Sequence, residues 1–287
     1  MHQIGEVLIS GAITGSSYAM MAMGMALVYG ISRVFNFAYG SFYILAGFLA
    51  YTLFSWGFGY PVAFAIVLPT MFWLGFAFER GALRPLRARP DWEMLVVMAT
   101  LGFALLLDNL NLAIFGPFAK ALPVLAEGTI HLAGFIIAKH DIAVAAISGS
   151  LIVGLWLFLN KTRQGLAMQG VAMDMTGAQV VGIPKDRMFG ITFGIACVLI
   201  GLGGLLLGSK YFIQYLGGWT IMVKAWVITA FGGMGNVLGA ISAAFILGII
   251  EAVIGWRFGL TWSMVAWFAA MIGMFTFRPQ GLLGTWG

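Results

Sequence analysis

Long, uninterrupted runs of apolar side chains are the feature that most restricts how this chain can fold. The stretch FAIVLPTMFWLGFAF, residues 64–78, is apolar on every side. With 61% hydrophobic and only 9% charged residues, a mean hydropathy of +0.99 excludes a water-soluble domain, whose surface must be largely polar. A membrane β-barrel is also excluded, because its strands alternate in hydrophobicity over about ten residues. The sequence therefore predicts membrane-spanning helices.

A membrane span needs about 20 mostly apolar residues, so the chain has room for about 8–10 membrane helices. We predict an all-α polytopic bundle forming one transmembrane domain, residues 1–287. The opening residues lack the basic stretch and cleavage site of a secretory signal, so we expect the first helix to be retained. The helices are predicted at residues 5–30, 37–57, 60–78, 94–115, 142–160, 187–207, 219–234, 239–256 and 260–277.

The basic residues predict which ends of these helices face the cytoplasm. With the predicted helices alternating in direction, ten Lys and Arg residues fall on one side, four on the other, and Lys224 within a span. The positive-inside rule makes the richer side cytoplasmic, with the N-terminus outside and the C-terminus inside. The formal net charge of +5 is then loop charge that orients the protein, and we expect no nucleic-acid partner.

One hydrophilic segment interrupts the apolar pattern on the predicted cytoplasmic side. This interhelical segment, residues 161–187, reads KTRQGLAMQGVAMDMTGAQVVGIPKDR. We predict a short helix at residues 167–181, closed by Gly182 in a left-handed conformation, with Pro184 preventing its continuation. Met168, Val171, Ala172 and Met175 fall on one face of this helix. The pattern fits either a helix lying on the lipid surface or a docking site for a soluble partner.

The segment and its neighbours resemble the permease subunits of the branched-chain amino acid (Liv-type) family of ABC importers. The resemblance lies in the motifs GVAMDMTGAQVVGIPKDRMFGITFGIACVLIGLGGLLLG (170–208), VKAWVITAFGGMGNVLGAISAAFILGIIEA (223–252), ALVYGISRVFNFAYGSFYILAGFLAY (26–51), TLGFALLLDN (100–109) and RPQGLLG (278–284). The motifs run in order over nearly the whole chain, which makes the resemblance specific.

The resemblance implies a bacterial inner-membrane, multi-pass permease subunit with no enzyme site of its own. It implies a second, similar permease subunit in a heterodimer, two cytoplasmic ATP-hydrolysing subunits that bind ATP and Mg, and an extracytoplasmic solute-binding protein. In this family the loop helix docks on the ATP-hydrolysing subunit. Carried over by position, the docking residues are Ala172, Asp174, Gly177, Val180, Gly182 and Ile183.

The resemblance also implies the class of cargo: branched-chain amino acids or related small amides, urea or carboxylates. Some positions depart from the family. Tyr39 and Ser41 stand where relatives commonly carry histidine and an acidic residue or glycine, and Asp108 stands where glutamine is frequent. If these positions border the pathway, the cargo differs from leucine, isoleucine and valine.

Polar residues inside the predicted spans are candidates for the pathway. A charge at a helix centre costs about 2.5–3.5 kcal/mol on insertion scales, so such groups should face protein or water. Asp108 and Asn111 share a helix face and either cap the outer helix end or line the pathway, whereas Lys224 and Glu251 either form a structural ion pair or bind cargo. The candidates are Asn36, Tyr39, Ser41, Asp108, Asn109, Asn111, Lys224 and Glu251. Trp219, near a predicted span end, is expected to be an interfacial anchor.

Two other classes of membrane protein are alternatives to the importer. An ion-coupled secondary transporter would use Asp108 or Glu251 to carry a proton or sodium ion, but the bounded cytoplasmic helix would then lack a purpose. A membrane-embedded enzyme is disfavoured, because no nucleophile, base and orienting group converge in the sequence. The stretch GGLLLGSK, residues 203–210, is not a phosphate-binding loop, because its order is Ser-Lys and it ends an apolar helix.

Overall fold

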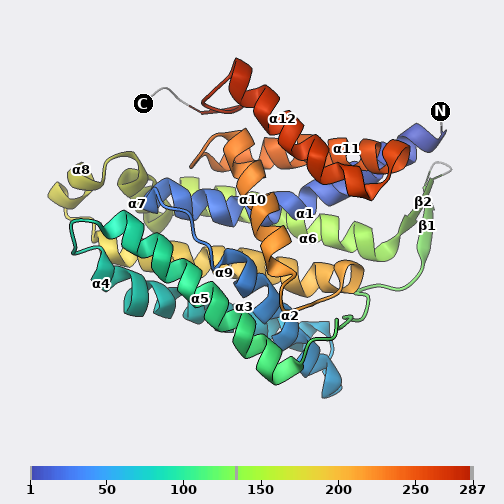
Figure 1. Ribbon diagram of the computed structural model, residues 1–287, viewed down its shortest axis with the longest axis horizontal. Helices are drawn as coiled ribbons and strands as arrows, with labels where there is room; N and C mark the ends of the chain where they lie inside the picture. The colour runs from blue at the N-terminus through green and yellow to red at the C-terminus, as the bar shows by residue number, and fades with distance from the viewer. Residues whose placement is uncertain (1, 133–134, 285–287) are drawn as a thin grey trace. The chain divides into compact units, whose positions relative to one another are not determined.

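Helices make up most of the chain in the computed structural model, which describes residues 2–132 and 135–284 (Figure 1). An antiparallel hairpin, β1 (Thr129–Leu132) and β2 (Phe135–Ala138), lies between α5 and α6. A π-helical turn η1 (Glu79–Leu83) and a 3-10 turn η2 (Leu260–Trp262) complete the elements. The α-helices are α1 (His2–Ser32), α2 (Tyr39–Ser55), α3 (Tyr60–Phe78), α4 (Arg84–Leu86), α5 (Trp92–Phe115), α6 (Lys139–Lys161), α7 (Arg163–Met173), α8 (Met175–Val180), α9 (Lys185–Tyr211), α10 (Gly218–Gly232), α11 (Val237–Phe258) and α12 (Ser263–Phe277).

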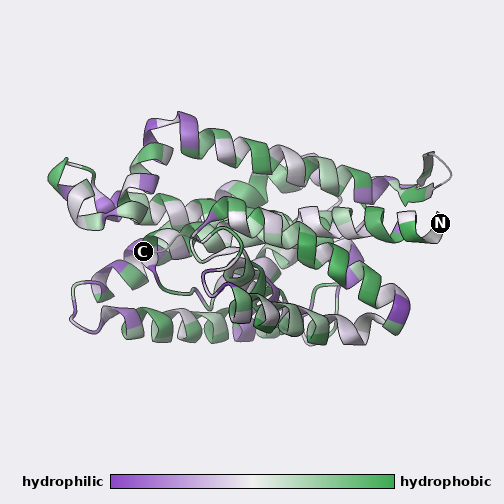
Figure 2. Ribbon diagram, turned by 90° about the horizontal axis from the view of Figure 1, so that it is seen from above, coloured by the Kyte–Doolittle hydropathy of each residue, from purple (hydrophilic) through white to green (hydrophobic). Residues whose placement is uncertain are grey.

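A helix stands at each of the nine ranges predicted from hydrophobicity. Among the described residues, six helices are long and apolar enough to cross a membrane, and α2 and α12 are shorter apolar helices. Hydrophilic residues gather in the connections and at helix ends (Figure 2). The long spans are Ile4–Ser32, Tyr60–Leu86, Trp92–Phe115, Lys139–Lys161, Lys185–Tyr211 and Val237–Phe258. The chain is therefore an all-α polytopic membrane protein.

The interhelical segment differs from its prediction in one respect. Where the sequence predicts one helix over 167–181, the structure has two, α7 and α8, which meet at Asp174. Asp174 is extended (φ −147°, ψ 104°), and its side chain accepts a hydrogen bond from the Thr176 backbone N–H at 2.9 Å. Aspartate is among the best helix N-caps, so it ends the first helix by starting the second.

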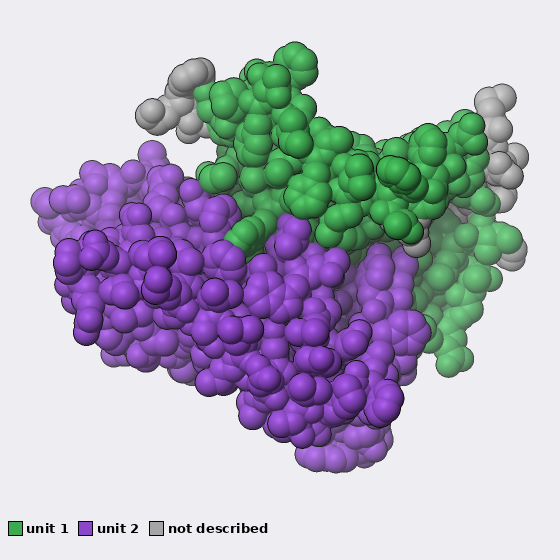
Figure 3. Space-filling model, in the orientation of Figure 1, with its two compact units in different colours: residues 1–26, 124–153, 224–287 green, residues 27–123, 154–223 purple. Residues whose placement is uncertain are grey.

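The described chain forms two compact units built from interleaved segments (Figure 3). Unit 1 comprises residues 1–26, 124–153 and 224–287, and unit 2 comprises residues 27–123 and 154–223. Helices α1, α6 and α10 each contribute residues to both units. Each unit is therefore assembled from segments that are separated in the sequence.

Unit 2 is held together by close contact of α9 with α2 and α3. Glycines permit this contact, because a side chain on any of them would collide with the facing helix: Gly75 faces Cys197, Gly194 faces Phe72, and Gly204 faces the Tyr43 carbonyl oxygen. In lipid, helices gain little hydrophobic free energy from association, so close backbone packing supplies the attraction. The fold of unit 2 therefore depends on small residues along α9.

Unit 1 uses the same principle at the crossing of α1 and α11. A Cβ on Gly11 would lie 2.8 Å from the Ile249 Cα, and one on Gly15 would lie 2.9 Å from the Phe245 Cα. Gly248 on α11 faces the Gly15 backbone in return. The pair Gly11/Gly15 is thus a packing surface, as expected of a small-xxx-small pattern.

Replacing Gly204 with valine should destabilise the protein by about 1–3 kcal/mol or more, because the added side chain forces α2 away from α9. The measurement is thermal unfolding of the purified protein in detergent. Gly102→Val is the matched control, since Gly102 also lies within a long helix but has no atom within 4 Å of its Cβ position. Equal losses in the two variants would contradict the packing role.

Candidate functional site

The interhelical segment is a well-capped structure on unit 2. The Thr162 hydroxyl caps α7 by accepting from the Gly165 N–H at 3.0 Å. At the other end Gly182 has φ +83°, which confirms the predicted left-handed conformation. The Gly182 N–H donates to the Gln179 carbonyl and the Ile183 N–H to the Ala178 carbonyl, at 3.0 and 2.9 Å. These two bonds form a Schellman motif, which closes α8 before Pro184.

Large apolar side chains project from this segment into the surroundings. Met173, Val180 and Val181 are 86%, 84% and 73% exposed. The predicted apolar face is instead directed inward, since Met168 and Val171 are buried. Met173, at the end of α7, and Val180, at the end of α8, are the apolar side chains left exposed instead. Exposed apolar clusters of this kind mark interaction sites.

The predicted docking residues share this outward-facing region. Asp174, Val180 and Gly182 are exposed, and Ala172, Gly177 and Ile183 are half-buried. The Ala172 carbonyl accepts a hydrogen bond from the Arg33 guanidinium at 3.1 Å. Arg33 directly follows α1 and has φ +55°. The segment is therefore tied to the end of α1 while its α8 side stays free.

A second group of predicted residues meets inside unit 2, where α2, α5 and α10 approach one another. Gly40 and Gly218 bring the first turns of α2 and α10 into backbone contact, since a Cβ on either would collide with the other. This contact positions Trp219, whose indole N–H donates to Asp108 Oδ2 at 2.9 Å. Trp219 was expected at the interface, and its role as a partner of Asp108 has no signal in the sequence beyond the adjoining glycines.

The polar groups beside Trp219 are incompletely satisfied. Asp108 is 3% exposed and Asn111 1% exposed. Among the described residues, Asp108 Oδ1 and Asn111 Nδ2 have no partner in hydrogen-bonding geometry. The Ser41 hydroxyl lies close to the carboxyl group but donates to the Ala104 carbonyl at 3.4 Å. Buried polar atoms are nearly always paired with protein or water, so this acceptor and this donor can still bond to water or to a polar solute.

The remaining candidates in this region have local roles. Asn36 is buried and accepts from the Ala38 N–H at 3.0 Å, which shapes the entry to α2, and Tyr39 is buried at the first position of α2. Asn109 lies on the exposed side of α5 and donates to the Leu105 carbonyl of its own helix. Asp108 lies about two turns before the end of α5 and does not cap it.

The ion pair predicted between Lys224 and Glu251 is present in unit 1. Lys224 Nζ lies 2.9 Å and 3.1 Å from the two Glu251 carboxylate oxygens and 2.5 Å from the Tyr18 hydroxyl oxygen. The Tyr18 hydroxyl donates to Glu251 at 3.1 Å. The ammonium also lies 4.7 Å from the Tyr18 ring centroid and 5.0 Å from that of Trp267. Side chains from α1, α11 and α12 thus surround the Lys224 ammonium, which belongs to α10.

Comparison with known proteins identifies relatives of the whole chain. Residues 7–277 match the model of a family described as the branched-chain amino acid transport system permease component. The chain is 29% identical over 294 residues to the high-affinity branched-chain amino acid transport system permease protein BraD of Pseudomonas aeruginosa, covering 97% of this chain and 95% of BraD. It is 28% identical over 300 residues to LivH of Escherichia coli, with the same coverage.

Two further comparisons extend the relationship. LivM of Escherichia coli, also a high-affinity branched-chain amino acid transport system permease protein, is 26% identical over 300 residues, covering 93% of this chain and 67% of LivM. A solved structure, PsaBC from Streptococcus pneumoniae in complex with Fab, superposes with a TM-score of 0.52 at 14% identity, over 98% of this chain and 93% of that one. At that identity the likeness concerns the fold alone.

The Lys224 cluster predicts an energetic signature of its own. Lys224→Met should destabilise the protein by about 3–5 kcal/mol, because Glu251 is left as an uncompensated buried charge. The double variant Lys224→Met/Glu251→Leu should recover much of that loss. Chemical unfolding in detergent measures both, with Arg257→Met, an exposed cation at the end of α11, as the control. Additive losses in the double variant would show that the two side chains are not coupled.

Proposed function

The chain belongs to the family of branched-chain amino acid transport system permease components, and on that premise we propose that it passes a branched-chain amino acid or a related small polar solute through an ATP-driven importer. The match over residues 7–277 carries this proposal. The chain is a transport subunit of a multi-pass inner-membrane system rather than an enzyme. An ion-coupled transporter that uses Asp108 or Glu251 is not favoured, since the relatives are permease proteins of branched-chain amino acid transport systems, and Glu251 is paired with Lys224.

The proposed cargo is a branched-chain amino acid or a related small amide, urea or carboxylate. Asp108 Oδ1 can accept from an ammonium or amide N–H, and Asn111 Nδ2 can donate to a carboxylate or carbonyl oxygen. The two groups lie three residues apart on one face of α5 and are both buried. A donor and an acceptor at this spacing suit the two ends of an amino acid, which supports a role for this face in the pathway.

The proposed partners follow from the exposed side of the interhelical segment. We propose that Ala172, Asp174, Gly177, Val180, Gly182 and Ile183 dock on a cytoplasmic ATP-hydrolysing subunit, which binds the ATP and Mg. The exposed Val180 and Val181 supply apolar contact area for this docking. Two such subunits, a solute-binding protein outside and a similar permease chain complete the assembly. LivH and LivM, two similar permeases of one organism, support a heterodimer.

The proposed orientation places the interhelical segment in the cytoplasm, with the N-terminus outside and the C-terminus inside. The ten basic residues assigned to that side support it. ATP-hydrolysing subunits work where ATP is available, so docking and orientation require the same side. Closure of those subunits then moves the segment and alternates the access of the pathway.

Uptake into vesicles tests the proposed function and the role of Asp108 together. The chain, reconstituted with its partner permease, ATP-hydrolysing subunits and binding protein, should import labelled leucine or a related solute only when ATP is supplied. Asp108→Asn keeps the acceptor for Trp219 but removes the charge, so uptake at low cargo concentration should fall about tenfold or more, as expected for a hydrogen bond to a charged group. Asn109→Ala, on the exposed side of α5, should have little effect.

These outcomes separate the two claims. Absence of ATP-dependent uptake for every branched-chain amino acid, amide, urea and small carboxylate would overturn the proposed function. Normal uptake by Asp108→Asn in an active complex would remove Asp108 from the pathway and leave the importer standing.

Gly182→Val tests the docking segment. A β-branched residue is strained at φ +83°, so the Schellman turn should open and the yield of copurified ATP-hydrolysing subunit should fall. Gly57→Val is the matched control: Gly57 has φ +85°, is also exposed, and likewise has no atom within 4 Å of its Cβ position, but it follows α2. Equal copurification of the two variants would mean that this turn does not hold the docking surface.

A further inference from the structure

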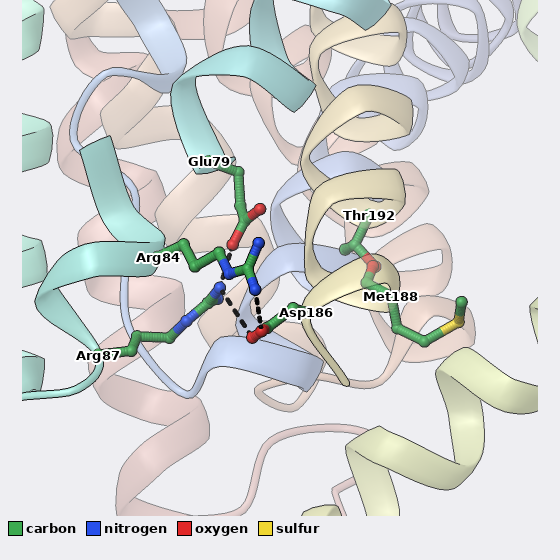
Figure 4. Close-up of polar contacts among 6 residues, drawn as sticks. All are labelled: Glu79, Arg84, Arg87, Asp186, Met188 and Thr192. Carbon is green, nitrogen blue, oxygen red and sulfur yellow. Dashed lines mark hydrogen bonds and ion pairs between the residues drawn. The ribbon is translucent and has the colours of Figure 1, made fainter. Parts of the chain in front are cut away.

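Four charged side chains gather where the interhelical segment enters α9, and neither the pathway nor the docking surface uses them. We name this group the clamp; Figure 4 shows its members, Glu79, Arg84, Arg87 and Asp186, directed toward one another. Glu79 begins the π-helical turn η1 after α3, Arg84 begins α4, and Arg87 follows it. Asp186 lies in the first turn of α9, two residues after Pro184.

The inner half of the clamp is a buried ion pair. Glu79 is only 1% exposed, and its carboxylate accepts from the guanidinium of Arg87, whose side chain is 14% exposed. That guanidinium lies 3.9 Å from the centroid of the Phe189 ring on α9. A buried carboxylate is costly without a counter-charge, so Arg87 is held between α3 and α9.

The outer half of the clamp reaches the interhelical segment. Asp186 lies 3.0 Å from the Arg84 guanidinium and 3.8 Å from that of Arg87, with its own side chain 38% exposed. Exposed pairs of this kind contribute little to stability. Their geometric effect is nevertheless direct, because they join the end of the interhelical segment, in the first turn of α9, to α4 and to Arg87 after it.

Helices α3 and α9, which adjoin the clamp, pack too closely to move independently of each other. Gly190 and Gly194 bring α9 against the rings of Phe76 and Phe72 on α3, and a Cβ on Gly190 would also lie 3.3 Å from Glu79 Oε2. The turn at Gly182 and Pro184, by contrast, has no side-chain packing around Gly182. The clamp lies on the α9 side of this turn, where it makes the first turn of α9 move together with η1 and α4 when the segment pulls on α9.

We infer that the clamp converts movement of the interhelical segment into movement of the α3–α9 pair, with Asp186 and Arg87 as positioning residues for transport. This inference rests on the proposed function, since it assumes that an ATP-hydrolysing subunit moves the segment. The clamp acts after docking. Its loss should therefore uncouple ATP hydrolysis from uptake without releasing the partner subunit.

The variant that tests the clamp is Asp186→Asn, which cuts the outer half and leaves the buried Glu79–Arg87 pair intact. In the reconstituted complex, the amount of cargo imported per ATP hydrolysed should fall about 2- to 30-fold, the range seen for changes along coupling networks. Copurification of the ATP-hydrolysing subunit should be unchanged. Asp186→Glu, which keeps the charge, should restore the ratio, and Glu93→Gln, an exposed carboxylate in the first turn of α5, is the matched control.

A distance measurement tests the clamp without any transport. Spin labels at Gly81→Cys and Gln179→Cys, in a Cys197→Ala background, report on η1 and α8, which both belong to unit 2. In the complex, the distance distribution should be narrow in the otherwise unaltered chain and broad after Asp186→Asn.

Each outcome decides for or against the clamp. An unchanged ratio of uptake to hydrolysis, or a ratio that Asp186→Glu fails to restore, would overturn the inference, and loss of the partner subunit would assign Asp186 to docking instead. If the unaltered complex shows no ATP-dependent uptake, the proposed function fails, and equal distance distributions in the two chains would still reject the clamp on its own.

Discussion

Close backbone contact between helices is the constraint on which the rest of this structure depends. Lipid removes most of the hydrophobic reason for apolar helices to associate, so dispersion contacts at short range must replace it. Gly204 on α9 and Gly15 on α1 provide these contacts in units 2 and 1 respectively. A contact of the same kind also positions a candidate pathway residue, because the close approach of Gly40 and Gly218 brings the Trp219 indole N–H within hydrogen-bonding distance of Asp108.

The two intramembrane carboxylates contrast in a way that separates support from function. The Glu251 carboxylate accepts hydrogen bonds from the Lys224 ammonium and the Tyr18 hydroxyl. The Trp267 ring also lies against the ammonium. Asp108 Oδ2 accepts from the Trp219 indole N–H, and among the described residues Oδ1 has no donor in full hydrogen-bonding geometry. Buried polar groups whose hydrogen bonds are all made within the protein stabilise its fold. Asp108 Oδ1 and Asn111 Nδ2, which have no partner among the described residues, can still form hydrogen bonds to another molecule. This contrast supports the proposed pathway role of Asp108 on α5.

The sequence predicts the helices well because each long apolar run has only one stable form in lipid. Gly182 is predicted for a similar reason, since a glycine followed closely by proline marks a helix end. The break at Asp174 is missed because the apolar periodicity continues across it, while the cap depends on one local hydrogen bond. Hairpin β1–β2 is also missed, and Trp219 acquires its partner Asp108 only through contact between helices that are distant in the sequence.

The basic residues that predict orientation are also part of the machinery that they orient. Counted in the sequence, Arg33, Arg84 and Arg87 are loop charges on one side of the membrane. In the structure Arg33 holds the Ala172 carbonyl near the end of α7, and the other two hold Asp186 at the start of α9. An arginine can do both because its charge sets topology during insertion, while its planar donors later fix geometry. The segment proposed to receive force from ATP hydrolysis is thus held near the end of α7 and at the start of α9 by arginines that the sequence predicts on the cytoplasmic side.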